Sequence, residues 1–301
     1  MQTLRRVGMD IAAAQGRLTQ EEVLYIDTRV VETVNPLLIG RKLFPVFTLP
    51  HAGFMTVRGY KRTNMSAARI SLYGETGGKD RTEKASFDIT VPVIDKEFEV
   101  MWRELEASRS NGVPLDLQDA ENAARKVAED EDKLLITGEY TGFRALGVEG
   151  LATSTGRNTK ASAGAWPANA LTDLSAAIAE LETDGHMGPY ACVLRSAWAA
   201  KLRALVSNTA VKWIEVIKDL FTAGIGGNGV YVSDSLFTST AATTSALVLE
   251  PSQENFELIV GRDLEVRKQE DVRGNLKCVV REVVAPRIKR PTSICELTGL
   301  T

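Results

Sequence analysis

Three glycines, Gly224, Gly226 and Gly229, have the G-x-G-x-x-G spacing of a dinucleotide-binding loop. Such a loop needs a strand before it and a helix after it, because the helix N-terminus receives the pyrophosphate. Here the amphipathic segment 213–221 precedes the glycines, and the strand-like segment 230–232 follows them. This is the reverse order, so we expect a glycine-rich surface loop rather than a nucleotide site.

Nucleophilic catalysis needs a base within hydrogen-bonding reach of a hydroxyl or thiol. The chain has only two histidines, His51 and His186. His51 follows a proline and His186 lies in a turn at 184–189 that contains two glycines and a proline. We therefore expect both histidines in exposed loops and predict no catalytic site.

The three cysteines, Cys192, Cys278 and Cys295, are widely spaced and form no C-x-x-C pair. With two histidines they leave few ligands for zinc or redox metals, so we expect buried thiols in a reducing interior. The sequence predicts neither a metal nor an organic cofactor.

Two charged clusters remain as candidates for ion binding. The acidic run 129–132 falls in a helical segment, which spreads its side chains around the axis. We expect it to form a solvated or interface-paired face rather than a divalent-ion site. Arg287, Lys289 and Arg290 form a small basic cluster, but three charges without interleaved aromatic residues are weak evidence for phosphate binding.

The overall composition is that of an ordinary globular chain. It has 301 residues, of which 44% are hydrophobic and 25% charged, and this length suggests about two domains. Lysine and arginine number 36 against 39 acidic residues, a net charge of −3, which argues against a dense basic face for nucleic acid. No apolar run reaches the roughly 18 residues of a membrane span.

The first predicted helix starts at Thr19, where Thr19 and Glu22 give the spacing of a capping box. Apolar residues at helical spacing follow, and Pro36 ends the run. One face therefore needs burial; its members include Val23, Ile26 and Val30. Residues 1–17 ahead of it are either a second helix or an arm.

A long hairpin is predicted between about residues 54 and 100. Phe87, Ile89, Val91 and Val93 alternate with other residues, which is typical of a strand with one buried face. An opposing run spans 54–73, and the glycine-rich segment 74–80 supplies the turn.

The length of this hairpin has a physical consequence. An arm of about 18 residues would extend about 60 Å, whereas a compact chain of this size has a radius of gyration of about 19 Å. A two-stranded ribbon alone is at best marginally stable. Either the ribbon bends back or another subunit completes its apolar face, which implies an assembly. A three-stranded meander within one domain is the alternative.

Further elements follow in mixed order. Segment 117–138 predicts a helix of about 20 residues with Gly138 as its C-terminal glycine. Helices are expected over 171–181 and from Ser196, with a strand at 190–194 between them. The last predicted strands are 256–260, 264–268 and 276–284.

Several segments, taken in order, resemble the encapsulins and the related tailed-virus major capsid proteins of the Hong Kong 97 type. The resemblance covers nearly the whole chain and rests on the order and spacing of its segments. These are LT at 18–19, ID at 26–27, GRK at 40–42, RKVAE at 125–129 with ED at 131–132, GVEGL at 147–151, DG at 184–185 with GPY at 188–190, and FELIVGRDL at 256–264.

The resemblance implies an α+β capsid fold with five parts. They are an N-terminal arm and helix (1–51), an extended hairpin called the E-loop with its base (52–100), a peripheral domain with a long spine helix (101–138), an axial domain (139–262) and return strands that complete the sheet (263–301).

The resemblance also implies which residues meet other copies. The expected E-loop contacts are Phe54, Val57, Tyr73, Phe87, Ile89 and Val91. The expected loop near the symmetry axes contains Gly224, Gly226, Gly227 and Gly229, and the helix with Val23, Ile26 and Val30 would lie on the inner face.

The resemblance implies that the chain forms a shell from pentamers and hexamers of itself and has no enzymatic activity. Our first hypothesis is a viral major capsid protein that encloses double-stranded DNA without sequence-specific binding. Residues 1–17 and the Ala/Ser/Thr-rich loops at 152–169 and 238–246 favour it, because a compact encapsulin lacks them. Such a virion capsid would assemble in the host cytoplasm, and its further partners would be portal, scaffold or decoration proteins.

The alternative is an encapsulin, a cytoplasmic compartment that encloses a cargo enzyme, with the helix at 19–34 lining its lumen. A third hypothesis, from another class, is a soluble α/β enzyme that uses one of the loops.

Overall fold

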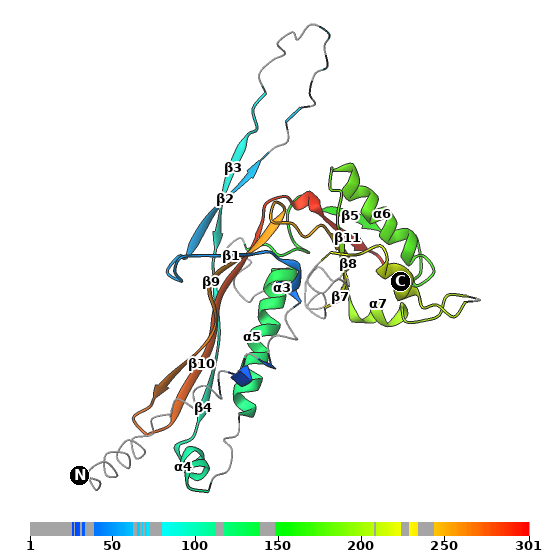
Figure 1. The fold of residues 1–301 in the computed structure, drawn as a ribbon. Helices are drawn as coiled ribbons and strands as arrows, with labels where there is room; N and C mark the ends of the chain where they lie inside the picture. The colour runs from blue at the N-terminus through cyan, green and yellow to red at the C-terminus, as the bar shows by residue number, and fades with distance from the viewer. Residues whose placement is uncertain are drawn as a thin grey trace.

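The computed structural model describes residues 26, 28–30, 32–33, 39–62, 65–66, 68, 70, 72, 80–111, 117–138, 148–207, 209–223, 229–233 and 244–300. Its described part contains two mixed sheets and a separate two-stranded hairpin. Figure 1 shows the hairpin projecting from one side of the body.

The first sheet has the strand order β1-β9-β10-β4. It consists of β1 (Val46–Thr48), β9 (Phe256–Glu270), β10 (Leu276–Ile288) and β4 (Val93–Val100). The short β1 runs parallel to β9, and the remaining pairs are antiparallel. The long helix α5 (Gln118–Thr137) packs against this sheet, with the one-turn α3 (Gly40–Leu43) beside it and α4 (Trp102–Asn111) beyond the end of β4.

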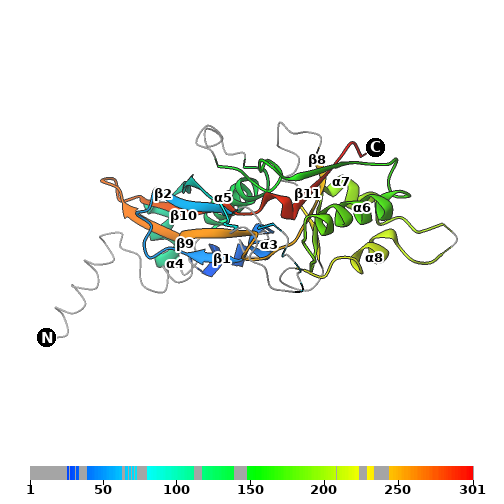
Figure 2. The same cartoon turned by 90° about the horizontal axis from the view of Figure 1, so that it is seen from above.

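The second sheet has the order β5-β11-β8-β6-β7. Its strands are β5 (Asn158–Ala161), β11 (Ile294–Thr298), β8 (Thr244–Leu249), β6 (Ala191–Leu194) and β7 (Val230–Val232). The helices that accompany it are α6 (Ala170–Thr183), α7 (Ser196–Lys201) and α8 (Trp213–Lys218), and the 3-10 turn η3 (Pro291–Ser293) precedes β11. Seen from above, these helices lie at the end of the molecule opposite the β9–β10 turn (Figure 2).

The spine helix α5 is confirmed close to its predicted limits. Small residues, Ala120, Ala123 and Ala124, let it approach the sheet closely, and Leu134 and Leu135 are buried near its end. Gly138 ends the helix with φ of 68°, a left-handed conformation that favours glycine.

The hairpin consists of β2 (Thr56–Arg62) and β3 (Lys84–Thr90), paired antiparallel from Thr56–Thr90 to Arg62–Lys84. It forms a sheet of its own, so the described residues show a ribbon and not the three-stranded meander. Beyond Pro92 the same chain segment continues as β4 in the first sheet.

The strand boundaries correct two predictions. The predicted alternation of buried residues does not extend through Pro92: Val91 is buried, whereas Val93 is 48% exposed. Proline cannot donate a ladder hydrogen bond, so β3 and β4 are separate strands with different buried faces. In addition, the two strands predicted at 256–260 and 264–268 form one strand, β9, which continues across the predicted division at 262/263.

The order of elements around the glycine-rich segment is as predicted. Helix α8 precedes it and strand β7 follows it. This is the opposite of the strand-then-helix order of a dinucleotide site. No helix in the described part of the chain is long and apolar enough to cross a membrane.

Candidate functional site

The base of the hairpin is anchored in its own subunit. Ile89 and Val91 are buried in a small apolar cluster with Ile259 of β9 and Val283 and Ala285 of β10. Phe87 and Val57, both half-buried, pack against this cluster. Gly59 lies against the Phe87 ring, where a Cβ atom would approach Cζ to 2.6 Å.

This anchoring corrects the predicted set of E-loop contacts. Ile89 and Val91 belong to the interior of the subunit, so their faces are not available to a neighbour. Phe54 is more exposed, and its ring stacks on His51 at a centroid distance of 5.0 Å. Tyr73 lies outside the described residues.

The segment between β2 and β3, residues 63–83, is called the outer hairpin. Its described side chains are mostly exposed and partly apolar. Ile70 is 98% exposed and Leu72 is 89% exposed, and Met65 is also exposed. Fully burying a side chain of this size is worth about 1.5–3 kcal/mol. These described side chains therefore present apolar area that their own subunit leaves uncovered.

The predicted inner-face helix also turns part of its apolar side inward. Residues 26, 28–30 and 32–33 are helical. Ile26 and Val30 are fully buried in the main core, whereas Arg29 and Glu32 are exposed and form a salt bridge at 3.5 Å. Val23 lies outside the described residues. Among the described residues of this helix, the apolar ones are therefore covered by their own subunit, and the exposed Thr28, Arg29 and Glu32 are polar.

The predicted axial loop is described only at its end. Gly229 has φ of 53° and lies against the Phe221 backbone, a close approach that favours glycine. Gly224, Gly226 and Gly227 lie outside the described residues.

A buried ion network ties the body together behind the hairpin. Arg41 of α3 donates to Glu131 of α5 at 2.8 Å, to Glu282 of β10 at 3.0 Å and to Asp263 of β9 at 2.6 Å. Glu131 and Glu282 are almost completely buried. The Arg41 guanidinium thus joins α3 to α5, β9 and β10.

The neighbouring Asp132 fixes the start of α3. Its carboxylate accepts the backbone N–H groups of Gly40 at 2.9 Å and Ile39 at 3.2 Å. The acidic run 129–132 is therefore not the solvated face that we expected, because Glu131 and Asp132 point into the interior. The sequence does contain a signal for this burial. Glu131 lies at the same helical spacing as Val127, Leu134 and Leu135, which form the apolar face of the helix.

Glu131 and Glu282 are placed to share a proton in this network. Each has one buried oxygen without a hydrogen-bond partner when both are taken as carboxylates. Burial, followed by the negative charge of Glu131, raises the pKa of Glu282 to about 9. Burial also raises the pKa of Glu131, with Arg41 opposing it. Since like charges in one buried site cannot both ionise readily, the pair favours a proton on Glu282.

The ion network and the base of the hairpin contact consecutive residues of β10. Glu282 reaches Arg41 beside α5, whereas the next residue, Val283, packs with Ile89 of the hairpin. The pairing of β10 with β9 shifts register around Val283. The two consecutive residues thus connect the spine helix and the hairpin through one strand.

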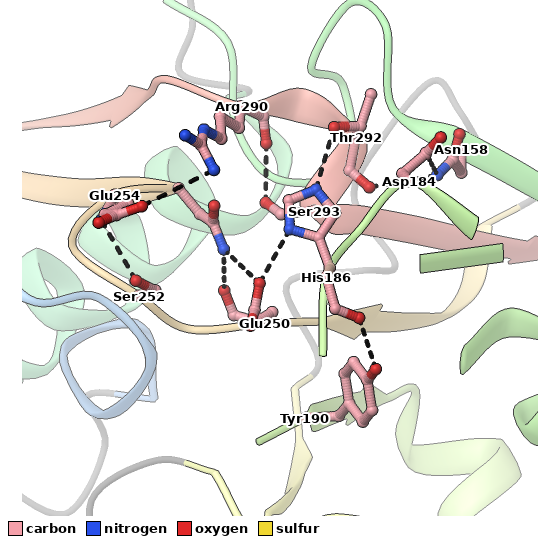
Figure 3. A network of polar contacts seen from close by, with 11 residues as sticks. Asn158, Asp184, His186, Tyr190, Glu250, Ser252, Glu254, Arg290, Thr292 and Ser293 are labelled. Carbon is pink, nitrogen blue, oxygen red and sulfur yellow. Dashed lines mark hydrogen bonds and ion pairs between the residues drawn. The ribbon is translucent and has the colours of Figure 1, made fainter. Parts of the chain in front are cut away.

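His186 is buried, contrary to its predicted place in an exposed loop. Its Nδ1 lies 2.9 Å from Oε2 of Glu250, and its Nε2 lies 3.1 Å from Oγ1 of Thr292 (Figure 3). Asn255 donates to the same Glu250 oxygen at 2.8 Å, and the Tyr190 hydroxyl donates to the His186 carbonyl at 2.6 Å. These contacts join the turn after α6 to η3 and to the residue that follows β8, so we assign His186 a structural role.

The described residues hold no group of three or more His, Cys, Asp or Glu side chains that could bind a metal. The three cysteines are buried, as predicted. Burial raises the pKa of Cys295 to about 12, which keeps that thiol protonated and unreactive.

The fold is that of Hong Kong 97-type capsid proteins. A virus-like particle from Pyrococcus furiosus matches with a TM-score of 0.66 at 19% identity, covering 90% of this chain and 96% of that one. The capsid of Myoviridae phage XM1 matches with a TM-score of 0.63 at 15% identity, covering 88% and 92%.

Sequence comparison then gives the family. The family model described as "encapsulating protein for peroxidase" matches residues 12–285, and the chain belongs to this family. The type 1 encapsulin shell protein EncA of Myxococcus xanthus is 31% identical over 95% of both chains. A diheme-cytochrome-encapsulin shell fusion protein of Kuenenia stuttgartiensis is 28% identical over 93% of this chain and 73% of its own length. The chain is thus a shell-forming structural protein that assembles with copies of itself, and not an enzyme.

Replacing Glu282 by glutamine tests the shared proton. The pKa of Glu282 rises from 4.5 to about 9 on folding, so over this window the folded protein keeps a proton that the unfolded chain has released. Stability should fall as pH rises through the window, by at most about 1.4 kcal/mol per pH unit, and then level off. Glu282→Gln should largely remove this fall when urea unfolding is followed across the window, because an amide does not titrate.

Glu265→Gln provides the control with the opposite sign. Burial opposes ionisation of Glu265, but hydrogen bonds from Arg262, Arg281 and Arg267 outweigh it and bring its pKa to about 2. Its contribution is present above a pH of about 4.5 and is lost toward about 2. This variant should keep the fall in stability between a pH of 4.5 and about 9 that the unmodified protein shows, because Glu282 is unchanged. An unchanged slope in Glu282→Gln would contradict the shared proton.

Proposed function

We propose that this chain is the shell subunit of an encapsulin-type compartment that encloses a protein, and not the capsid subunit of a virus that encloses DNA. The observation that carries the proposal is the 31% identity to the Myxococcus xanthus shell protein over 95% of both chains. The phage capsids with the same fold are only 12–15% identical. This reverses the preference that we drew from residues 1–17 and the two loops.

The names of the relatives support a protein cargo. The family description refers to a peroxidase, and two relatives are fusions of a shell protein with a diheme cytochrome and with a ferritin-like protein. Each named partner is a protein. We infer that the cargo of this shell belongs to the same broad class of redox and iron-handling proteins.

The net charge agrees with this proposal. A chain with 36 basic and 39 acidic residues has no excess of cations to neutralise a packed polyanion. The exposed side chains in the described part of the helix at 26–33 are polar and of mixed charge, with Arg29 paired to Glu32. Such a surface suits hydrogen bonding to a protein segment better than binding to phosphates.

The content of native particles tests the choice between cargo and genome. Particles purified from the source organism and treated with nuclease should contain one abundant second protein, identified by mass spectrometry, and no protected DNA of uniform length. Particles that protect a discrete double-stranded genome would contradict the proposal. Either result would leave the assembly of a shell unaffected, because the test concerns only its content.

The outer hairpin gives a test of assembly itself. Ile70→Asp combined with Leu72→Asp should prevent closed particles, because these exposed side chains need cover from another copy. The subunit should remain folded, since neither residue belongs to an apolar cluster of the described core. Negative-stain microscopy and size-exclusion chromatography measure the first effect, and circular dichroism measures the second.

Ile89→Asp is the matched control within the same hairpin. Ile89 is buried in its own subunit, so an unpaired carboxylate there should destabilise folding rather than assembly alone. The proposed role of the hairpin would be wrong if the Ile70/Leu72 variant formed normal particles.

A further inference from the structure

A cavity of about 460 Å³ lies between the base of the hairpin and the end of β10. Its lining comes from β2, from the segment before β9, and from the C-terminal end of β10 with the two residues that follow it. The lining residues are Arg58, Gly59, Tyr60, Glu254, Arg287, Lys289 and Arg290. Segments far apart in the sequence thus contribute four cations and one carboxylate to one cavity.

The four cations of this lining share three carboxylates of the described residues. Arg58 donates two hydrogen bonds to Asp88, at 2.8 and 3.2 Å. Arg287 and Lys289 share one buried carboxylate, Glu257, with Lys289 Nζ at 2.8 Å from Oε2. Arg290 lies 3.7 Å from Glu254, and both side chains are largely exposed (Figure 3). Such a pair contributes little and can exchange partners readily.

Two further observations describe the inner side of the cavity. The Nε–H of Arg287 is buried and has no hydrogen-bond partner among the described residues, while its guanidinium lies over the Phe47 ring at 4.8 Å. Burial, and then the charge of Arg287, lowers the pKa of Lys289. An anion in the cavity would relieve this crowding of positive charge.

The lining also indicates what kind of anion fits. Guanidinium groups bind phosphate oxygens through paired N–H donors. Tyr60 places a ring that is 55% exposed beside Arg58, and an exposed aromatic ring provides a stacking surface for a base. The volume lies within the roughly 300–1,000 Å³ of small-molecule sites, which exceeds the need of a lone phosphate ion.

We propose that this cavity binds a nucleotide, with the phosphates on Lys289 and Arg290, next to the Arg58–Asp88 pair, and the base on Tyr60. Two sources share this chemistry of a phosphate next to an aromatic base. They are a free nucleoside phosphate and one nucleotide of a single-stranded nucleic acid. The basic cluster at 287–290 lacked an aromatic partner in the sequence; the fold supplies one from the hairpin.

Isothermal titration of the assembled full-length protein tests this proposal with ATP, inorganic triphosphate and a short oligothymidylate as probes. Arg290→Ala should weaken ATP binding by about tenfold or more, since a charge-assisted contact is lost. Tyr60→Ala should weaken binding of ATP and the oligonucleotide but leave triphosphate unchanged. Tighter binding of ATP identifies a free nucleotide as the ligand, and tighter binding of the oligonucleotide identifies a strand.

Lys277→Ala is the matched control, because Lys277 is an exposed cation near the start of β10, outside the cavity. It should bind all three probes as the unmodified protein does. Absence of saturable binding for every probe would overturn the proposal. So would an Arg290→Ala variant that binds ATP normally, or a Lys277→Ala variant that is weakened equally.

Discussion

A two-stranded ribbon that projects from a folded body has no second layer to cover its side chains. In this chain the paired part of the ribbon runs from Thr56–Thr90 to Arg62–Lys84, and exposed apolar residues such as Ile70 and Leu72 lie beyond it. The apolar surface that a monomer leaves open is the surface that other copies can bury. We propose that shell formation uses this surface, because each copy both extends a ribbon and offers a body.

The ribbon can act on another copy only if its base is rigid. Ile89 and Val91 provide this by packing on β9 and β10 within the subunit. On the same strand, Glu282 enters the buried network around Arg41. Breaking one partner of a buried ion network costs about 3–5 kcal/mol, so this network holds α3, α5, β9 and β10 in one arrangement. The base of the hairpin therefore packs on strands that the Arg41 network joins to α3 and α5.

Much of this architecture is readable from sequence because it depends on local patterns. The helical spacing and Gly138 predict α5, and the alternation from Phe87 to Val91 predicts β3. The same patterns fail where a tertiary contact decides. Glu131 and Asp132 read as surface residues until Arg41 and the backbone of α3, some 90 positions away, are placed against them.

The candidate surfaces were harder to predict than the elements. Alternation shows that Ile89 is on a buried face, but it does not show whether its own chain or a neighbour covers that face. His186 lies in a glycine-rich turn and is nevertheless buried, in contact with η3 and with the residue that follows β8. Local composition predicted the turn correctly and could not reveal partners more than 60 residues away.

The central claim is that other copies cover the outer ribbon. Hydrogen exchange followed by mass spectrometry, on assembled particles and on dissociated subunits, tests it most directly. We predict that backbone amides of the outer hairpin become strongly protected in particles, while those of α5, β9 and β10 are protected equally in both states. Hairpin amides that exchange at the same rate in particles and subunits would contradict the account.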